Sequence, residues 1–219
     1  HIDALNRIKK GLNNEVPFIM TVFNPISIAG QLVGSEETFL SHLQLAANRV
    51  HSGLNVITKT FCSYVSEILN VGADGIFFAT TAWGTTDRLT KDDYATFGRP
   101  YDLQILQAAR DAWFNVLHVC RDNNMLNELT DYPVHAINWD SHAPGNASLE
   151  EARVFLDKVP MGGVSRENLL SLDALELQSE IGKVIRNSEN KPIIIAPNCS
   201  ISPRCPEVNL SALAEIPNV

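Results

Sequence analysis

The sequence is short of cysteine, of long apolar runs and of positive charge. Its four cysteines are spread among 219 residues, unlike the dense disulfide framework of a small secreted protein. No apolar run approaches the roughly 20 residues of a membrane-spanning helix, and there is no signal-peptide pattern. The net charge of -8 argues against nucleic acid or an anionic membrane as partner. We therefore expect reduced thiols and a cytoplasmic protein.

What remains is the composition of one globular domain, with 45% hydrophobic and 19% charged residues. We expect a single domain over residues 1–219. The chain begins at His1, without an initiator methionine, and enters a helical pattern at once. We expect that an upstream part of the domain is missing from this segment.

Short apolar runs alternate with helical patterns along the whole chain, which is typical of βα units and a parallel sheet. The predicted strands cover residues 18–23, 75–79, 114–119, 134–139, 159–164 and 193–196. Helices are predicted from about residues 35, 54, 90, 100, 123, 148, 175 and 206. No G-x-G-x-x-G follows the first strand, as a doubly wound dinucleotide-binding sheet would require. The pattern predicts a TIM (βα)₈ barrel lacking its first one or two units.

In such a barrel the residues that end each strand meet at one mouth, where active sites lie. Polar or aromatic residues follow several of the predicted strands here. We predict substrate contacts from Asn24, Thr80, Trp83 and Asn198. For Thr80 and Trp83, ordinary packing at the rim is an equal alternative.

The segment His118-Val119-Cys120 is the most informative motif of the chain. Residues two apart on a strand face the same side, so His118 and Cys120 can aim at one point, which Cys199 can reach from another strand end. One imidazole and two thiolates suit zinc and leave one coordination position open, as in catalytic sites. Asp140 is a candidate for a fourth ligand or for the hydrogen-bond acceptor that orients His118. The alternative is that these are buried core residues.

Four longer segments carry a resemblance to a known family. They are Gly72-Ala73-Asp74 leading into Ile76-Phe77-Phe78, Asp92-Asp93-Tyr94-x-x-Phe97-x-x-Pro100-Tyr101, Asn138-Trp139-Asp140, and Asn198-Cys199-x-Ile201-x-Pro203-x-Cys205-Pro206-Glu207-x-Asn209. They resemble the uroporphyrinogen decarboxylase superfamily, and the H-x-C motif with a distant cysteine resembles its zinc methyltransferase branch. The resemblance implies a TIM barrel with His118, Cys120 and Cys199 as zinc ligands.

The resemblance implies methyl transfer from cobalamin, a corrinoid carried on a partner protein, to a small-molecule thiol. Zinc would deprotonate that thiol and keep it nucleophilic. Asp140 is the predicted catalytic residue beside the zinc. A homodimer is the family's expected assembly. Cys205 departs from the family's usual threonine and could compete as a ligand, and Met161-Gly162-Gly163 matches the family only loosely.

Two other functions stay open. Metal-free decarboxylation in porphyrin biosynthesis is the alternative reaction. The resemblance to that branch is weaker, because residues 80–83 and 198–199 lack the tyrosine and the histidine that the branch carries there. A barrel that binds a ligand or a corrinoid protein without turnover is the third.

Overall fold

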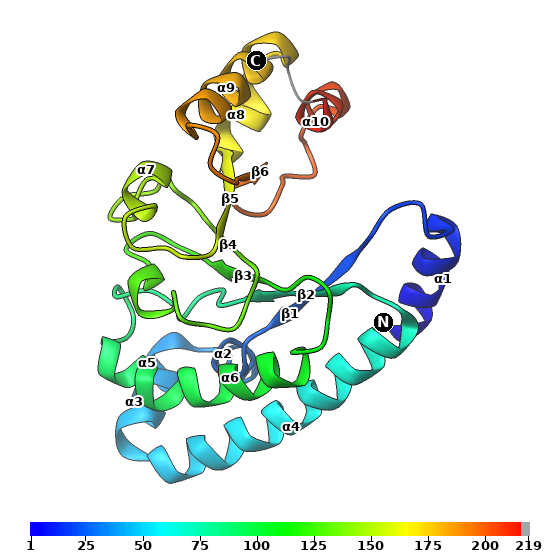
Figure 1. Ribbon diagram of the computed structural model, residues 1–219. Helices are drawn as coiled ribbons and strands as arrows, with labels where there is room; N and C mark the ends of the chain where they lie inside the picture. Colours follow the sequence, from blue (N-terminus) through cyan, green and yellow to red (C-terminus); the bar gives the residue numbers. More distant parts are fainter. Residues whose placement is uncertain (216–219) are drawn as a thin grey trace.

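The computed structural model describes residues 1–215 and is built around one parallel sheet. Its six strands pair in the order in which they occur in the chain, and the sheet curves while helices cover its outer side (Figure 1). The strands are β1 (Ile19–Phe23), β2 (Gly75–Ala79), β3 (Val116–Val119), β4 (Ala136–Trp139), β5 (Val159–Val164) and β6 (Ile194–Pro197). This arrangement is the wall of a (βα)₈ barrel with two strands fewer than the eight of the closed fold. The prediction of a partial TIM barrel is confirmed.

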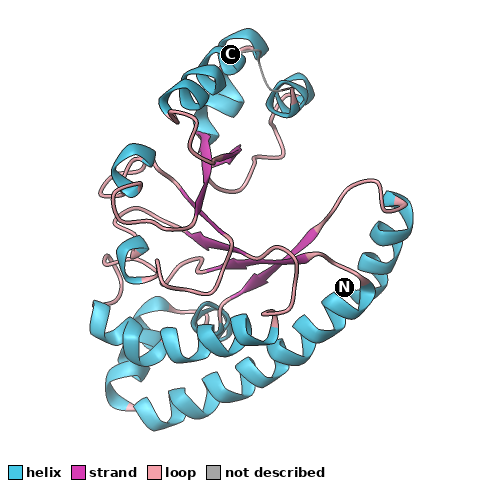
Figure 2. Cartoon of the chain, viewed as in Figure 1, coloured by secondary structure: helices cyan, strands magenta, loops and turns pink. Residues whose placement is uncertain are grey.

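Helices alternate with these strands through the described chain (Figure 2). They are α1 (Ile2–Leu12), α2 (Pro25–Val33), α3 (Glu36–Leu45), α4 (Ala47–Val71), α5 (Lys91–Phe97), α6 (Arg99–Ala108), α7 (Leu149–Ala152), α8 (Arg166–Ser171), α9 (Ala174–Asn187) and α10 (Glu207–Ala214), with a 3₁₀ turn at Leu126–Glu128. Within residues 1–215, no helix combines the length and the apolar character needed to cross a bilayer.

The alternation of side chains along each strand separates a packed outer face from an inner face that carries polar groups. Ile76, Phe78 and Leu117 are fully buried and belong to the main hydrophobic core beneath the helices. Their neighbours Phe77 and His118 point the other way, into the barrel interior. His118 therefore reaches the inside of the barrel because it lies one residue after the buried Leu117.

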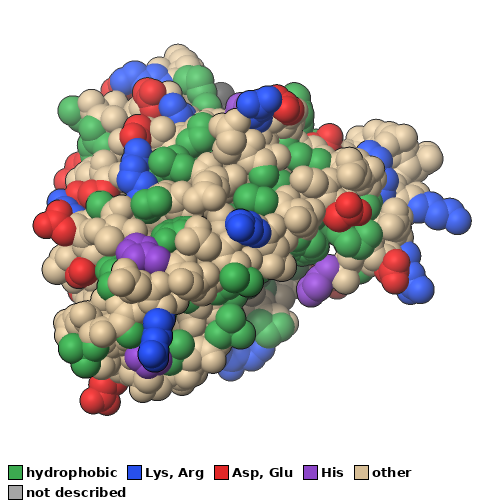
Figure 3. All heavy atoms as spheres, turned by 90° about the horizontal axis from the view of Figure 1, so that it is seen from below, with side chains coloured by type: hydrophobic (Ala, Val, Ile, Leu, Met, Phe, Trp, Pro, Cys, Tyr) green, Lys and Arg blue, Asp and Glu red, His purple; other side chains and the backbone are tan. Residues whose placement is uncertain are grey.

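The long helix α4 supplies much of the outer layer. Leu54, Val65 and Ile68 on its inner side are fully buried, and the helix packs along α6, α2 and α1. Viewed from below, the outer surface carries interspersed acidic and basic side chains (Figure 3). A second, smaller core at the C-terminal end joins α8, α9 and α10, with Leu177 and Ile181 at its centre.

All six predicted strands are present, with ends that differ by at most two residues. The prediction missed α2 and α8, although each has a capping residue. Asn24 accepts a hydrogen bond from the Ser27 amide, and Ser165 accepts one from Asn168. Both helices start directly after a strand, so these caps were visible as Asn and Ser at strand ends.

Five predicted helices have different bounds. The helix expected to run from Ser35 past residue 46 breaks at Ala46, which is the N-cap of α4, so α4 starts well before Leu54. The helix expected at 123–129 is a single 3₁₀ turn. The helix capped by Ser148 ends at Ala152, which leaves Phe155 outside it. Pro206 is the N-cap of α10 rather than its first residue.

Gly75→Ala is expected to destabilise the fold by about 3 kcal/mol. A Cβ at this position would lie 1.9 Å from the Phe114 carbonyl oxygen, which is backbone and cannot move aside cheaply. Urea denaturation of both variants provides the measurement. Gly53→Ala in α4 is the matched control, because a Cβ there meets nothing within 4 Å, and it should stabilise the protein by up to about 1 kcal/mol. Equal stability of the two variants would contradict this account.

Candidate metal centre

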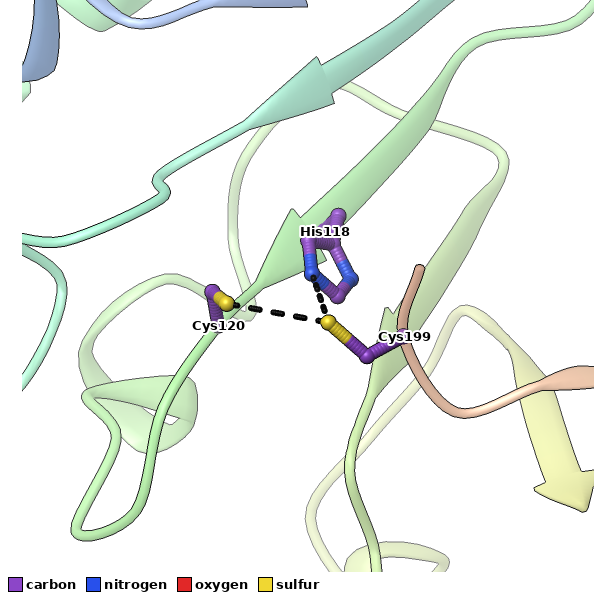
Figure 4. Close-up of side chains that lie close together, drawn as sticks. All are labelled: His118, Cys120 and Cys199. Carbon is purple, nitrogen blue, oxygen red and sulfur yellow. Dashed lines mark hydrogen bonds between the residues drawn. The ribbon is translucent and has the colours of Figure 1, made fainter. Parts of the chain in front are cut away.

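Three potential metal ligands meet at the C-terminal ends of β3 and β6. His118 lies on β3, Cys120 directly follows that strand, and Cys199 lies two residues after β6. The Sγ atoms of Cys120 and Cys199 are 3.8 Å apart, and Cys199 Sγ is 3.6 Å from His118 Nε2 (Figure 4). One ligand atom from each residue lies within 4.8 Å of the other two. Strands far apart in sequence thus bring one nitrogen and two sulfurs to one point.

These distances fit the coordination shell of zinc. Zn–S bonds of about 2.3 Å and Zn–N bonds of about 2.0 Å in a tetrahedron imply S···S edges of about 3.8 Å and S···N edges of about 3.6 Å. The two measured distances match both edges. All four cysteines of the chain are free thiols, so neither sulfur is committed to a disulfide. The donor set therefore suits zinc and leaves a fourth position for another ligand.

Asn138 on β4 orients His118. Its Nδ2 group donates hydrogen bonds to the carbonyls of Met161 and Pro197, which turns its Oδ1 toward His118 Nδ1 at 2.6 Å. His118 Nδ1 therefore donates to this oxygen, and Nε2 is the nitrogen that faces the sulfurs. Asp140 was a candidate for this acceptor or for a fourth ligand; Asn138 holds the acceptor position because the sheet register pairs it directly with His118.

The pKa values of the Cys120 and Cys199 thiols are shifted in opposite directions. The hydrogen bond from Cys120 and the neighbouring His118 ring lower the pKa of the Cys199 thiol to about 3. The pKa of Cys120 is raised, because its hydrogen bond to Cys199 and its burial both favour the protonated thiol. One thiolate is therefore ready to bind a cation, and binding of a divalent ion would displace the second proton.

Asn198 and Asp140 form a hydrogen-bonded pair beside the cluster. The Oδ1 atom of Asn198 accepts the Gly163 amide, and its Nδ2 atom donates to Asp140 Oδ1 at 3.1 Å. The other contact of Nδ2 is with His142 Nδ1. Gly162 leaves room for this fully buried amide, since a Cβ there would lie 2.9 Å from Asn198 Oδ1. Asn198 thus positions Asp140 rather than presenting a free amide to a ligand.

Two cavities meet at the cluster and share His118, Cys120, Cys199 and Ser200 as walls. The larger, of about 540 Å³, extends over the inner face of the sheet and is mainly apolar. Its other lining residues are Thr21, Phe23, Phe77, Ala79, Thr81, Asn138, Met161, Ala196, Pro197 and Ile201. The smaller, of about 290 Å³, is polar and is completed by Arg121, Asp122, Asp140 and Arg166. We name them the apolar chamber and the polar chamber.

None of the four predicted substrate-binding residues lines either chamber; besides Asn198, they are Asn24, Thr80 and Trp83. Asn24 is fully buried and donates to the Tyr94 hydroxyl, and Thr80 is fully buried and hydrogen bonds to the His118 carbonyl. Trp83 is 4% exposed and packs edge-on against Phe39. All three are buried and make structural contacts within the protein.

Cys205 also lies outside the metal cluster. Its thiol donates to the Leu169 carbonyl at 3.3 Å, and its side chain packs on the smaller C-terminal core. The expectation that it could compete as a ligand is not supported by this placement. The residues that sequence reasoning missed are Asn138, Arg121 and Arg166; only Asn138 had a usable signal, since it pairs with His118 in the predicted sheet register.

Asn138→Ala is expected to weaken zinc binding about 10- to 100-fold, because the variant loses the oxygen that fixes the His118 ring. Competition with a chromophoric chelator measures the affinity. Asn6→Ala is the control, since this asparagine lies on α1 and bonds only to its own helix. Unchanged zinc affinity in Asn138→Ala, with an unaltered fold, would show that the ring does not need this partner.

Comparisons with known proteins place these observations in context. The family described as uroporphyrinogen decarboxylase (URO-D) matches residues 1–218. The chain is 23% identical over 217 residues to "Methylcobamide:CoM methyltransferase MtaA" of Methanosarcina barkeri, covering 97% of this chain and 61% of that protein. It is 26% identical over 201 residues to "Uroporphyrinogen decarboxylase" of Chlorobium chlorochromatii (strain CaD3), covering 85% of this chain and 54% of that protein.

A solved structure shows the same fold. A "methyltransferase from Methanosarcina mazei" superposes with a TM-score of 0.80 at 18% identity, covering 97% of this chain and 61% of that one. The chain thus spans about three fifths of the length of the methyltransferases it matches. The curated relatives divide between two reactions at similar identity, so the chemistry must be argued from the site.

Proposed function

The chain belongs to the uroporphyrinogen decarboxylase family, and we propose that within this family it serves as a zinc-dependent methyltransferase that moves a methyl group from a corrinoid to a thiol. One observation carries the proposal. His118, Cys120 and Cys199 converge with two donor separations that fit tetrahedral zinc. Metal-free decarboxylation gives no role to two thiols and an oriented imidazole at the barrel mouth.

The cluster would hold the ion through His118 Nε2 and both sulfurs, with Asn138 fixing the ring. Zinc bound there would lower the pKa of a thiol in the fourth position and leave its sulfur nucleophilic. The apolar chamber beside it has Phe77 and Met161 in its wall, which exclude water from the reacting carbon.

The reaction transfers one methyl group and releases one proton. The acceptor thiol loses its proton, and its sulfur electron pair forms the new S–C bond. The methyl–cobalt bond of the corrinoid substrate breaks with its electron pair left on cobalt, which passes from Co(III) to Co(I). The protein contributes position: the thiol and the methyl group must lie in line within a few ångströms.

Asp140 is the candidate proton acceptor. It lines the polar chamber together with the cluster, and hydrogen bonds from the Asn198 side chain and the His142 amide hold its Oδ1 atom. Its second oxygen can take the proton of an arriving thiol and pass it to solvent. We assign Asp140 this role rather than that of a zinc ligand, because it is not part of the three-donor cluster.

The test supplies zinc-loaded protein with methylcob(III)alamin and, separately, L-homocysteine, 2-mercaptoethanesulfonate and 2-mercaptoethanol. We expect zinc-dependent loss of the methylcobalamin spectrum together with a methyl thioether detected by mass spectrometry. Removing zinc with a chelator should stop the reaction, and adding zinc should restore it. Absence of thioether with all three thiols would overturn the proposal.

Uroporphyrinogen decarboxylation is the second candidate, because the chain is 26% identical to a protein of that name. Turnover of uroporphyrinogen by zinc-free protein would establish it. Inactivity in both assays, with a corrinoid protein still bound, would favour a barrel that binds without turnover.

A further inference from the structure

The polar chamber has an inner and an outer part. His118, Cys120, Cys199 and Asp140 are buried or half-buried and form the inner part. Arg121, Asp122, Arg166 and Ser200 are exposed and form the outer part. A thiol that reaches the cluster through this chamber must therefore hold its other end among Arg121, Asp122, Arg166 and Ser200.

Both arginines are free to bind a ligand. Within residues 1–215, neither Arg121 nor Arg166 forms an ion pair with a carboxylate at 4.0 Å or less, and Asp122 has no cationic partner there. When a ligand binds one of these charged side chains, the main free-energy cost is the loss of that side chain's hydration, since no existing ion pair must be broken.

Arg121 has an unusual backbone conformation that a hydrogen bond holds in place. Its φ of 78° lies in the left-handed region, which is uncommon for a residue other than glycine. Asn146 Nδ2 holds this conformation by donating to the Arg121 carbonyl at 3.0 Å. Arg166 enters the chamber from another element, as the first residue of α8 after β5. Two separate segments therefore bring a guanidinium to the same small space.

We propose that the polar chamber selects a short amino-acid thiol, with its carboxylate bound by Arg121 and Arg166 and its ammonium bound by Asp122. The inference rests on the proposed thiol methylation and names the acceptor class. Guanidinium groups bind carboxylates through paired hydrogen bonds, and Asp122 matches the opposite charge of the same head group. A purely anionic thiol can bind the two arginines but offers no cation to Asp122, so it lacks one of the contacts that an amino-acid head group makes. A volume of about 290 Å³ suits a molecule of this size.

Binding of the methylated product tests the head group without requiring metal or turnover. Isothermal titration of the purified protein would compare L-methionine with 2-(methylthio)ethanesulfonate, two thioethers that differ in the head group. We expect L-methionine to bind at least 10-fold more tightly. Equal or tighter binding of the sulfonate, or no binding of L-methionine, would overturn the inference.

Variants locate the contacts. Arg166→Gln and Asp122→Asn should each weaken L-methionine binding at least 10-fold, and Asp122→Asn should leave or improve binding of the sulfonate. Arg7→Gln and Asp3→Asn on α1 are matched controls, and melting temperatures check the fold. Unchanged affinity in both chamber variants would refute the assignment. If thiols are methylated without preference for L-homocysteine over 2-mercaptoethanesulfonate, this inference fails and the transferase stands; if L-methionine binds but no thiol is methylated, the reverse holds.

Discussion

Cys199→Ala is expected to remove zinc and thiol methylation together. The variant keeps His118 and Cys120 but loses the sulfur that lies 3.6 Å from His118 Nε2 and 3.8 Å from Cys120 Sγ. Loss of an outer partner such as Asn138 costs about 10- to 100-fold in metal affinity, so loss of a ligand should exceed 100-fold. Elemental analysis after dialysis should fall from one zinc per chain to almost none.

Cys205→Ala provides the matched control. It removes a thiol from the same C-terminal segment, but that thiol donates to the Leu169 carbonyl and lies outside the cluster. This variant should keep its zinc and its activity. Zinc retained in Cys199→Ala, or lost only in Cys205→Ala, would contradict the ligand assignment and with it the proposed transferase.

The sequence was a good guide to the strands and a poorer one to the short helices. Strands buried on their outer face appear as apolar runs, so even the four-residue β3 and β4 were recognised. Helix α8 has only six residues, fewer than two turns, which is too short to show a clear helical period. The break at Ala46 was hidden because the apolar residues continue in helical spacing on both sides of it.

The convergence of His118, Cys120 and Cys199 could be predicted because strand periodicity and strand ends determine it. His118 and Cys120 share a face by their spacing, and Cys199 follows a recognisable strand. The substrate contacts could not be predicted in this way. Thr80 and Trp83 also follow a strand, yet they are buried beneath the loop, and only coordinates show which side of a loop faces the cavity. Arg121 and Arg166 gave no signal, because arginine beside a strand end is common.

A buried carboxyl far from the cluster leads to the second large prediction. Asp102 on α6 is fully buried, and its Oδ2 atom accepts hydrogen bonds from the hydroxyls of Tyr94 and Tyr132 at 2.6 and 2.9 Å. Its Oδ1 atom has no partner within the described residues. Burial raises the pKa of Asp102 from 3.8 to about 7, although the hydrogen bonds from both tyrosines act to lower it.

Asp102 should therefore make the protein less stable as the pH rises. In the unfolded chain the carboxyl loses its proton near pH 4, whereas the folded protein keeps it until about pH 7. Since the folded state binds this proton more tightly, its contribution is fully present below pH 4 and falls between about pH 4 and 7. A gap of this size between folded and unfolded pKa values is worth up to about 4 kcal/mol.

Asp102→Asn should remove this penalty, because the amide oxygen still accepts both tyrosine hydroxyls and carries no charge at any pH. We expect the variant to match the parent near pH 4 and to be more stable by about 2 to 4 kcal/mol at pH 8, measured by urea denaturation across this range. Asp131→Asn is the contrasting control: its bond to Arg99 lowers the pKa of Asp131, so that variant should lose stability above pH 4. A parallel pH dependence of Asp102→Asn and the parent would show that Asp102 is ionised in the folded protein at little cost, and that the buried tyrosines fully compensate its charge.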